Sequence, residues 1–238
     1  MPMFMDVAPF DDVNVRLALK YAINRKQLVD ILLSGYGQVG NDVPITPANR
    51  FFNTEMPQHA YDPDKARHYL KKAGLDKLSV ELSAADAAFP KAVDAAVLFN
   101  ELAAKAGIDI KVIREPNDGY WSNVWLKKPF CTCFWGGRPT EDLMFTTAYV
   151  TDSPWNDTHW KNKRFNELLV QARTELDSDR RREMYWEMQD ILRVDGGAII
   201  PVYAQYVFAN RDTLSHGPLA GNRDVDGWKS MERWWFKS

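Results

Sequence analysis

The sequence has few of the residues that mark disulfide-bonded or metal-binding proteins. Its 238 residues include two cysteines and four histidines. Cys131 and Cys133 stand only two positions apart, which is a poor geometry for a mutual disulfide, and two such ligands without clustered histidines do not make a zinc site. We therefore predict no metal site, interpret both thiols as small core residues, and infer no redox compartment from them.

An excess of positive charge and a long apolar run are also lacking. The 30 basic residues are interspersed with 32 acidic ones, for a net charge of -2, which argues against nucleic acid and against polybasic attachment to a membrane. No run approaches the length of a membrane span, and the first six residues lack the charged start and apolar stretch of a secretory signal. The chain as given could also be a mature or truncated piece of a longer protein.

Motifs for catalysis and for cofactors are scarce. The four histidines lie in unrelated contexts, and no G-x-S-x-G elbow is present. Residues 35–40 match the G-x-G-x-x-G spacing, but a predicted helix precedes them and Asn41-Asp42-Val43-Pro44 follows, whereas a dinucleotide site needs a strand before and a helix after. We predict no catalytic residue and no cofactor, and interpret residues 35–47 as a glycine-rich loop.

Apolar and aromatic residues are plentiful, at 45% apolar content and nine tryptophans, and capping signals divide the chain into elements. Helices are predicted after Asp12, after Asn24, from Asp62-Pro63 to Gly74, over 90–105, from Thr140, over 165–176, and from a Ser178 cap to Gly196. Strands are predicted over 78–82, 108–112 and 130–135. Residues 198–202 and 206–209 are predicted as strands, or as a turn flanked by strands. A loop or irregular helix is predicted over 115–125, and a polar loop over 151–163.

The order of strand, helix and strand over residues 78–112 predicts a βαβ unit with parallel strands. We therefore expect an α/β fold, with a mixed sheet, a parallel βαβ core and flanking helices. Residues 1–209 form the main unit in this interpretation. Residues 210–238 form a tail whose signals fade, apart from an apolar end at Trp234-Trp235-Phe236.

The rest of the chain is organised around residues 130–142, Phe-Cys-Thr-Cys-Phe-Trp-Gly-Gly-Arg-Pro-Thr-Glu-Asp. This stretch predicts a buried strand, a turn and a helix start, and such strand ends hold ligands in open α/β sheets. Trp135 offers an apolar wall, Gly136 and Gly137 offer backbone donors, and Arg138 can bind a carboxylate or phosphate. Asp142 could fix Arg138 or receive a ligand cation. An ordinary strand-to-helix connection with a packed Trp and a solvated Arg remains the alternative.

The order of motifs resembles the peptide/nickel family of ABC-transporter solute-binding proteins. Residues 9–24, PFDDVNVRLALKYAIN, are similar to the signature of that family. Further similar blocks are Pro44-Ile45-Thr46-Pro47, Tyr61-Asp62-Pro63-Asp64-Lys65-Ala66, Trp135-Gly136-Gly137, residues 165–173 and residues 180–185. The resemblance covers most of residues 9–209.

This resemblance implies the C-terminal lobe of a type II periplasmic-binding-protein fold. Family members are about twice as long, and their ligand lies between two lobes that close by a hinge motion. The implied partners are a peptide or other small solute, an N-terminal lobe outside this chain, to which the tail would return, and an ABC-transporter permease. The implied location of the parent protein is periplasmic or extracytoplasmic.

Two departures from the family pattern bear on the ligand. Arg138 stands where peptide binders usually carry an acidic residue, and residues 84–89, Ala-Ala-Asp-Ala-Ala-Phe, replace a loop with a basic and an aromatic residue. Both disfavour a simple dipeptide, and Arg138 would suit a ligand with a carboxylate or other anion at the turn. We expect Trp135 to stack on the ligand and Tyr36, Asp86, Asp142 and Asn156 to be secondary contacts. A sensory module of a regulator, or a hydrolase that uses cleft acids, are the alternatives.

Overall fold

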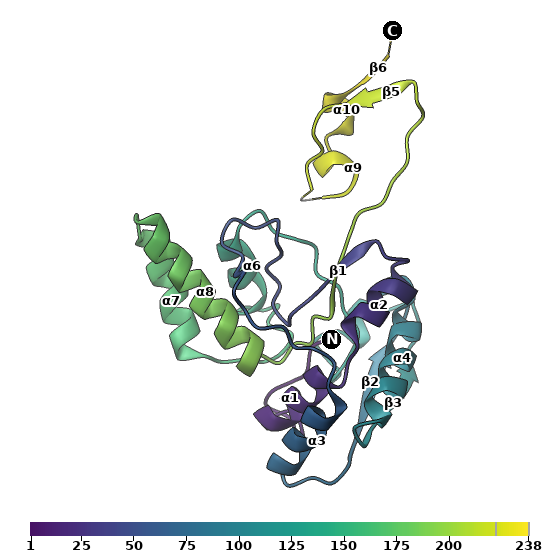
Figure 1. The fold of residues 1–238 in the computed structure, drawn as a ribbon, viewed down its shortest axis with the longest axis vertical. Helices are drawn as coiled ribbons and strands as arrows, with labels where there is room; N and C mark the ends of the chain where they lie inside the picture. Colours follow the sequence, from purple (N-terminus) through teal and green to yellow (C-terminus); the bar gives the residue numbers. More distant parts are fainter. Residues whose placement is uncertain (222, 238) are drawn as a thin grey trace.

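The computed structural model describes residues 1–221 and 223–237, which form a main body and a small C-terminal unit beyond an extended connection (Figure 1). The elements are α1 Val13–Tyr21, α2 Arg25–Leu32, β1 Gly37–Val39, α3 Pro63–Lys72, β2 Leu78–Ala84, α4 Ala92–Ala104, β3 Ile108–Arg114, α5 Tyr120–Asn123, α6 Glu141–Ala148, α7 Lys163–Thr174, α8 Ser178–Asp195, β4 Val202–Ala204, β5 Leu214–His216, α9 Asp224–Gly227, α10 Ser230–Arg233 and β6 Trp234–Phe236.

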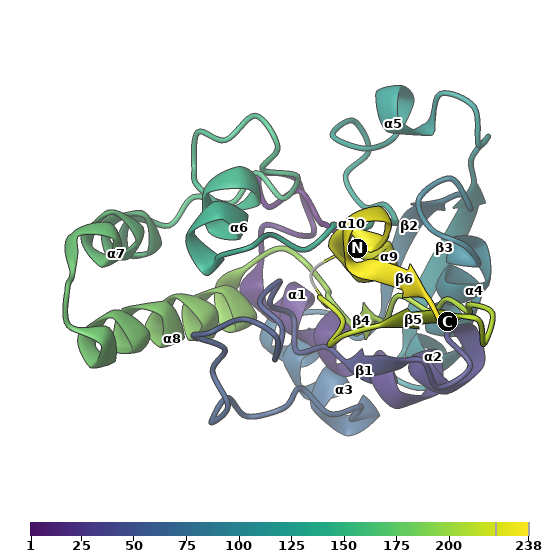
Figure 2. The ribbon, with the colours of Figure 1, turned by 90° about the horizontal axis from the view of Figure 1, so that it is seen from above.

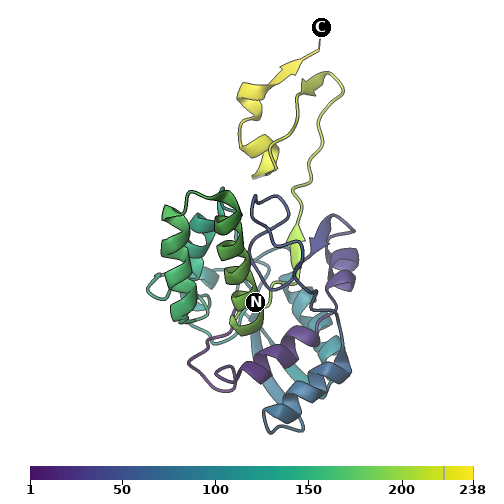
Figure 3. The ribbon, with the colours of Figure 1, turned by 60° about the vertical axis from the view of Figure 1, so that its left-hand side comes forward.

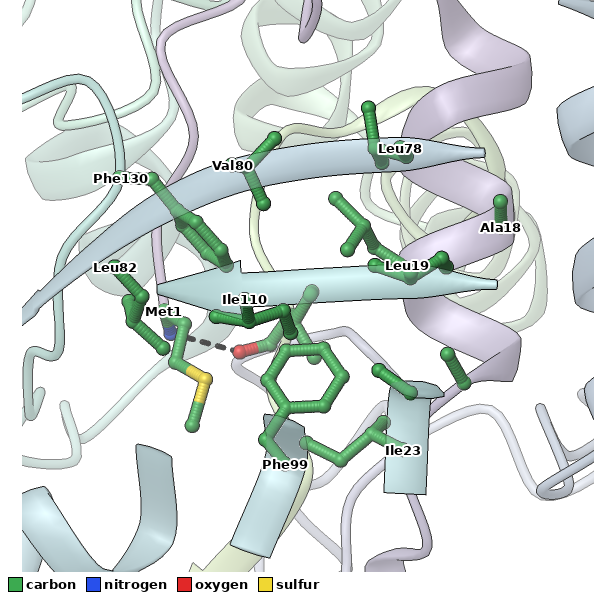
Figure 4. Packing of buried hydrophobic residues seen from close by; sticks show 14 of the residues in the cluster. Met1, Ala18, Leu19, Ile23, Leu78, Val80, Leu82, Phe99, Ile110 and Phe130 are labelled. Carbon is green, nitrogen blue, oxygen red and sulfur yellow. Dashed lines mark hydrogen bonds between the residues drawn. The ribbon is translucent and has the colours of Figure 1, made fainter. Parts of the chain in front are cut away.

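Two parallel strands, β2 and β3, stand at the centre of the main body. They pair in register from Leu78 opposite Ile108 to Ala84 opposite Arg114, and α4 connects them. Phe99 of α4 packs in the same buried cluster as Leu82 and Ile110 (Figure 4). The predicted βαβ unit is therefore confirmed.

Isolated bridges widen this pair into a mixed sheet. Ser83 of β2 bridges Cys131 in parallel, and Phe130 bridges Met3 in the antiparallel sense. The predicted strand over 130–135 is only partly confirmed, because the bridges stop at Cys131. The Tyr120 hydroxyl donates to the Thr132 carbonyl at 2.7 Å, so a side chain takes the position that a further strand would need.

The helices begin where short polar side chains can cap them. Asp12, Asn24, Asp62 and Thr140 each accept a hydrogen bond from a backbone N–H in the first turn of α1, α2, α3 and α6, as predicted. At α8 the predicted cap is wrong by one residue. Asp177 accepts from the N–H groups of the second and third residues after it, and its carboxylate is the better acceptor at a helix N-terminus.

Two large apolar clusters make up most of the interior. One lies among α1, α3, α4, β2 and β3, and the other lies among α6, α7 and α8. Figure 3 shows α7 and α8 side by side, at a distance from β2 and β3. Buried cations join the clusters: Lys20 of α1 donates to the carbonyls of Arg193 and Gly196 at the end of α8, where the helix dipole favours positive charge.

The polar contacts in this region include a buried carboxylate, that of Asp42. Asp42 accepts from Arg25 and from His59 Nδ1, at 2.7 Å in each case, and Arg193 Nη1 lies 2.8 Å from His59 Nε2. An arginine can only donate, so His59 Nε2 is the acceptor and Nδ1 carries the proton. The imidazole is therefore neutral in this network.

Three predictions about the end of the chain and the glycine-rich loop need correction. Residues 35–47 include strand β1, which pairs antiparallel with β4 because the backbone of residues 202–204 lies alongside it. Residues 206–209 do not form a strand, and of 198–202 only Ala198 and Val202 pair. In the tail, β5 and β6 form an antiparallel pair. Phe208 packs on Trp234 with ring centroids 5.5 Å apart, so a residue before 210 contacts the tail.

The C-terminal unit is held together internally. Within the described part of the chain, the hydrogen bonds and ion pairs of residues 210–237 join residues of that segment to each other, as in the salt bridge from Arg233 to Asp226. Trp235 and Phe236, at the apolar end of the tail, are exposed. No helix among the described residues has the length and apolar character to cross a membrane.

Candidate functional site

Three loops leave the sheet at one edge, because β2, β3 and the segment at Phe130–Cys131 run in the same direction. Hydrogen bonds hold the first two loops together: Glu115 N–H donates to the Ala84 carbonyl, and Ala87 N–H donates to Asn117 Oδ1. Figure 2 shows α5 beyond the ends of β2 and β3. This edge is where open α/β sheets bind ligands.

Four tryptophans gather on these loops and on the loop after α6. The centroids of Trp125, Trp135 and Trp155 lie 6.0 to 6.3 Å from each other, with the rings steeply inclined, and Trp121 meets Trp125 at 5.8 Å. These are favourable edge-to-face separations. Trp121 and Trp155 keep 41% and 46% of their surface exposed, so the cluster has an open aromatic side. We call Trp121, Trp125, Trp135 and Trp155 the tryptophan cluster.

Asp157 holds two members of the cluster by hydrogen bonds on their buried side. It is buried, and its Oδ2 accepts from Nε1 of Trp125 and from Nε1 of Trp135, at 3.0 Å each. Burial raises the pKa of Asp157 above its ordinary value, and the two indole N–H groups partly oppose the rise. The sequence analysis did not predict Asp157, Trp121, Trp125 or Trp155 as site residues; the abundance of tryptophan was the one available signal.

Arg138 lies beside the cluster without an anionic partner. Its guanidinium carbon is 5.8 Å from the centre of the Trp135 ring, and Nη1 donates to the Gly136 carbonyl at 2.8 Å. Within residues 1–221 and 223–237 no carboxylate lies within 4.0 Å of it. The remaining N–H groups of Arg138 can therefore donate to a ligand carboxylate.

The two glycines of the turn are not needed for a left-handed backbone. Neither Gly136 nor Gly137 has a positive φ, and a Cβ on Gly136 would meet only Arg138 Nη1, at an ordinary 3.7 Å. Their amides donate to no backbone carbonyl in the described part of the chain, so they are free to bind a ligand. The lack of a side chain at Gly136 leaves space beside Arg138.

Asp142 does not fix Arg138. It forms a salt bridge with Arg173 of α7, in which Arg173 Nε donates to Asp142 Oδ2 at 2.6 Å. Asp142 lies in the first turn of α6, and α6 packs against α7, so Arg173 reaches it first. That expectation about the pair is therefore corrected.

Asn156 is buried and braces its own loop. Its Nδ2 donates to the Trp160 carbonyl at 2.7 Å, and its Oδ1 accepts from Thr158 Oγ1 at 3.1 Å. The side chain holds residues 155–157 in place, and with them Trp155 and Asp157. Its effect on a ligand is thus indirect.

Asp86 lies in the loop after β2, at the same edge as the cluster, whereas Tyr36 lies beside β1. Asp86 is exposed and accepts from Val93 N–H in the first turn of α4, where Lys91 provides no side-chain cap. Tyr36 is 57% exposed beside β1, and its carbonyl accepts from Gln205 N–H. The structure does not bring Tyr36 into the aromatic contacts of the tryptophan cluster among the described residues.

The titratable groups near the cluster are poorly suited to catalysis. Burial raises the pKa of Cys131 to about 12 and also raises that of Cys133, so both thiols stay protonated near neutral pH. His159 pairs with Asp6 at 2.8 Å and stacks on Phe4, which makes it a loop residue. No group of three His, Cys, Asp or Glu in the described residues is arranged to hold a metal ion.

By its fold, the chain is an α/β lobe of the type II periplasmic-binding-protein class. The model of the family "Bacterial extracellular solute-binding proteins, family 5 Middle" matches residues 1–157, which include the tryptophan cluster and Arg138. The chain therefore belongs to this family, as the sequence motifs predicted.

Named relatives agree with this assignment. The dipeptide-binding protein of Escherichia coli K12 is 28% identical over 207 residues, covering 81% of this chain and 37% of that protein. A dipeptide-binding protein from Pseudoalteromonas sp. SM9913, solved with Met-Leu, superposes with a TM-score of 0.81 at 19% identity, over 99% of this chain and 47% of that one. NikZ from Campylobacter jejuni, solved with Ni(L-His), gives 0.77 at 23% identity, over 98% and 50%. The chain spans less than half the length of its curated relative.

Proposed function

We propose that this chain is the C-terminal ligand-binding lobe of an extracytoplasmic solute-binding protein that delivers peptides or related small anionic solutes to an ABC importer. The family assignment and the dipeptide-binding relatives support the transport role. In this proposal the chain binds and delivers its solute without chemical change. Its partners are an N-terminal lobe and an ABC-transporter permease.

The observation that carries the proposal is the unpaired Arg138 beside Trp135, at the edge where the parallel strands end. A cation without a carboxylate partner next to an apolar wall suits a solute that has an anionic group and an apolar part. The ring of Trp135 would pack against the solute, and Arg138 would pair with the anionic group of the solute. The amides of Gly136 and Gly137 would donate hydrogen bonds to that anionic group. Tyr36 and Asp86 remain proposed secondary contacts, and Asp142 and Asn156 would act through α7 and the 155–157 loop.

We further propose that residues 1–209 form the lobe and that the tail belongs with the opposite lobe. Ligand sites usually bury 70–90% of the ligand. One lobe covers one side only, so much of this burial is lost when the chain is alone.

Titration calorimetry with a library of peptides and small anionic solutes tests the proposal. We expect binding constants of about 1 mM or weaker for the chain alone, and loss of binding in Trp135→Ala. Micromolar binding by the chain alone would show a complete site and contradict the one-lobe architecture. Absence of binding across the library, at millimolar protein and solute, would contradict the binding role itself.

A further inference from the structure

The tryptophan cluster has one side that is held by hydrogen bonds in the interior and another side that is exposed to solvent. Trp125 and Trp135 are half-buried and fixed by the shared acceptor Asp157, whereas Trp121 and Trp155 are exposed. A cluster that served only as core would bury its largest side chains, as Trp160 in the same loop is buried at 1% exposure. Here the outer rings present their faces and edges to solvent in fixed positions.

The rings contact each other, so no group fits between them. Centroid separations of 6.0 to 6.3 Å at steep interplanar angles leave the indoles in edge-to-face contact. A methylammonium group enclosed among three faces would need the rings farther apart, since a cation is held several ångströms from each centroid. The cluster therefore offers an exterior platform, and a flat apolar group can lie against Trp155 and Trp121.

The charge of Arg138, beside the cluster, determines which kind of molecule can carry the flat group. Arg138 borders Trp135, and Trp135 borders Trp155, with the guanidinium 5.8 Å from the first ring and the two rings 6.0 Å apart. An extended peptide advances by about 3.3 to 3.6 Å per residue. A peptide carboxylate that binds Arg138 and an aromatic side chain that lies on Trp155 would therefore come from residues at most two or three positions apart in the peptide. The buried carboxylate of Asp157 already accepts from two indoles, so the half-buried guanidinium of Arg138 is the charge that a solute meets.

We propose that the tryptophan cluster is a subsite for the aromatic side chain of a short peptide whose carboxylate binds Arg138. The inference rests on the proposed function and adds a preference for Phe, Tyr or Trp in the solute. A sugar could also stack on an indole, but a neutral sugar would leave Arg138 without a partner. The peptide is therefore the occupant that satisfies both parts of the site.

The chain labelled with 5-fluorotryptophan allows this preference to be measured at low affinity by ¹⁹F NMR. Its nine tryptophans give separate probes, which single Trp→Phe variants assign. The probes are Ala-Phe-Ala, Ala-Leu-Ala, Ala-Ala-Ala, the C-terminal amide of Ala-Phe-Ala, and maltose. We expect Ala-Phe-Ala to bind about tenfold more tightly than Ala-Ala-Ala, with the largest shifts at Trp155 and Trp121, because aromatic pairs add to the gain from area alone. The amide should bind about tenfold less tightly than the free acid.

Variants separate the subsite from general binding. Trp155→Ala should bring Ala-Phe-Ala down to the affinity of Ala-Ala-Ala, whereas Trp155→Phe should keep most of the preference. Trp228→Ala is the matched control, because Trp228 is a 68% exposed tryptophan in the C-terminal unit, and it should change nothing. For the Trp155 variants, unchanged resonances of the tryptophans outside the cluster, such as the buried Trp160, will show that the protein is folded.

Three results would overturn the inference. If Ala-Ala-Ala binds as tightly as Ala-Phe-Ala, or if the preference survives in Trp155→Ala, the cluster is not a side-chain subsite, while the proposed function stands. If maltose binds more tightly than every peptide, the platform serves a sugar. If no probe binds, the proposed function fails together with the inference.

Discussion

Oδ2 of Asp157 lies 3.0 Å from Nε1 of Trp135, and the same oxygen accepts from Trp125 at the same distance. One buried carboxylate therefore sets the orientation of two indoles that come from different loops. The loop after β3 and the turn after Phe130–Cys131 are joined at this atom. The proposed site thus depends on a residue that faces away from the solute.

Replacing Asp157 with alanine should lower the free energy of unfolding by about 1 to 3 kcal/mol. Both indole N–H groups would lose their acceptor in a partly desolvated position. Chemical denaturation gives the value, and near-ultraviolet circular dichroism should report the loss of fixed indole geometry. Asp118→Ala, an exposed acid in the preceding loop, should stay within about 0.5 kcal/mol of wild type. Equal stability of the two variants would show that Asp157 does not fix the rings.

The raised pKa of Asp157 also predicts a pH dependence. The folded state holds this proton to higher pH than the unfolded state, whose value is about 3.9, so stability falls as pH rises between that value and the folded one. Asp157→Asn keeps an acceptor oxygen and removes the titration. The unfolding free energy of the wild type, minus that of Asp157→Asn, should therefore decrease as the pH rises through this window. A constant difference from pH 3 to pH 7 would contradict the prediction.

The network of Asp42, Arg25 and His59 should dominate acid sensitivity. Burial alone would raise the pKa of Asp42, but the charge of Arg25 and the hydrogen bond from His59 lower it far below the ordinary range. Burial lowers the pKa of His59, and Asp42 opposes this only in part. Both groups therefore contribute stability above their unfolded values, about 3.9 and 6.5, that is lost as pH falls below each.

Two variants test this network. Asp42→Ala should cost about 3 to 5 kcal/mol because it leaves Arg25 buried without its partner, whereas Asp30→Ala, on an exposed pair with Lys26, should cost less than about 1 kcal/mol. His59→Gln should show a shallower loss of stability between pH 6.5 and pH 5 than wild type. A slope unchanged by this substitution would exclude His59 as the titrating group.

Arg138 and Arg173 provide a matched pair for ligand binding. Arg138→Gln should weaken binding of peptides with a free carboxylate while leaving binding of their amides unchanged, since it removes the charge and not the aromatic wall. Arg173→Gln removes an exposed salt bridge to Asp142 and should cost less than about 1 kcal/mol of stability, and any change in affinity should be the same for the acid and its amide. Calorimetry with an acid and its amide measures both. Equal loss for acid and amide in Arg138→Gln would contradict pairing with the carboxylate.

Removal of residues 206–238 should leave the main body folded. The hydrogen bonds and ion pairs of residues 210–237 are internal to that unit in the described residues, and Phe208 belongs with it through Trp234. We expect thermal unfolding of the truncated chain within about 3 °C of the parent, because no core residue is lost. A large drop, or loss of cooperative unfolding, would show that the tail stabilises the body.

Local sequence was sufficient to predict elements whose signals are short in range. The caps at Asp62 and Thr140, with apolar periodicity behind them, predicted helices that the structure confirms. Alternation over 78–82 and 108–112 predicted the parallel pair. The strand predicted ahead of Gly136 and Arg138 is confirmed only at Phe130 and Cys131, where bridges to Met3 and Ser83 form.

Features that depend on tertiary contacts could not be predicted in this way. The strand at Phe130 ends early because Tyr120, from another loop, binds the Thr132 carbonyl. Asp142 pairs with Arg173, which is 31 residues away, and nothing in the sequence distinguishes that partner from Arg138. Asp157 looks like one polar residue among several in a loop until folding brings Trp125 and Trp135 to it.

Photo-crosslinking with a tripeptide that carries p-benzoylphenylalanine at its centre tests the central claim most directly. Trypsin does not cleave before proline, so Lys128-Pro129 and Arg138-Pro139 stay intact and Trp135, Arg138 and Trp155 fall in one fragment that ends at Lys161. We predict that mass spectrometry will locate the adduct in this fragment, and that excess unlabelled Ala-Phe-Ala will compete it away. Competed adducts located in α2 and α4, or in the C-terminal unit, would contradict the assignment of the site.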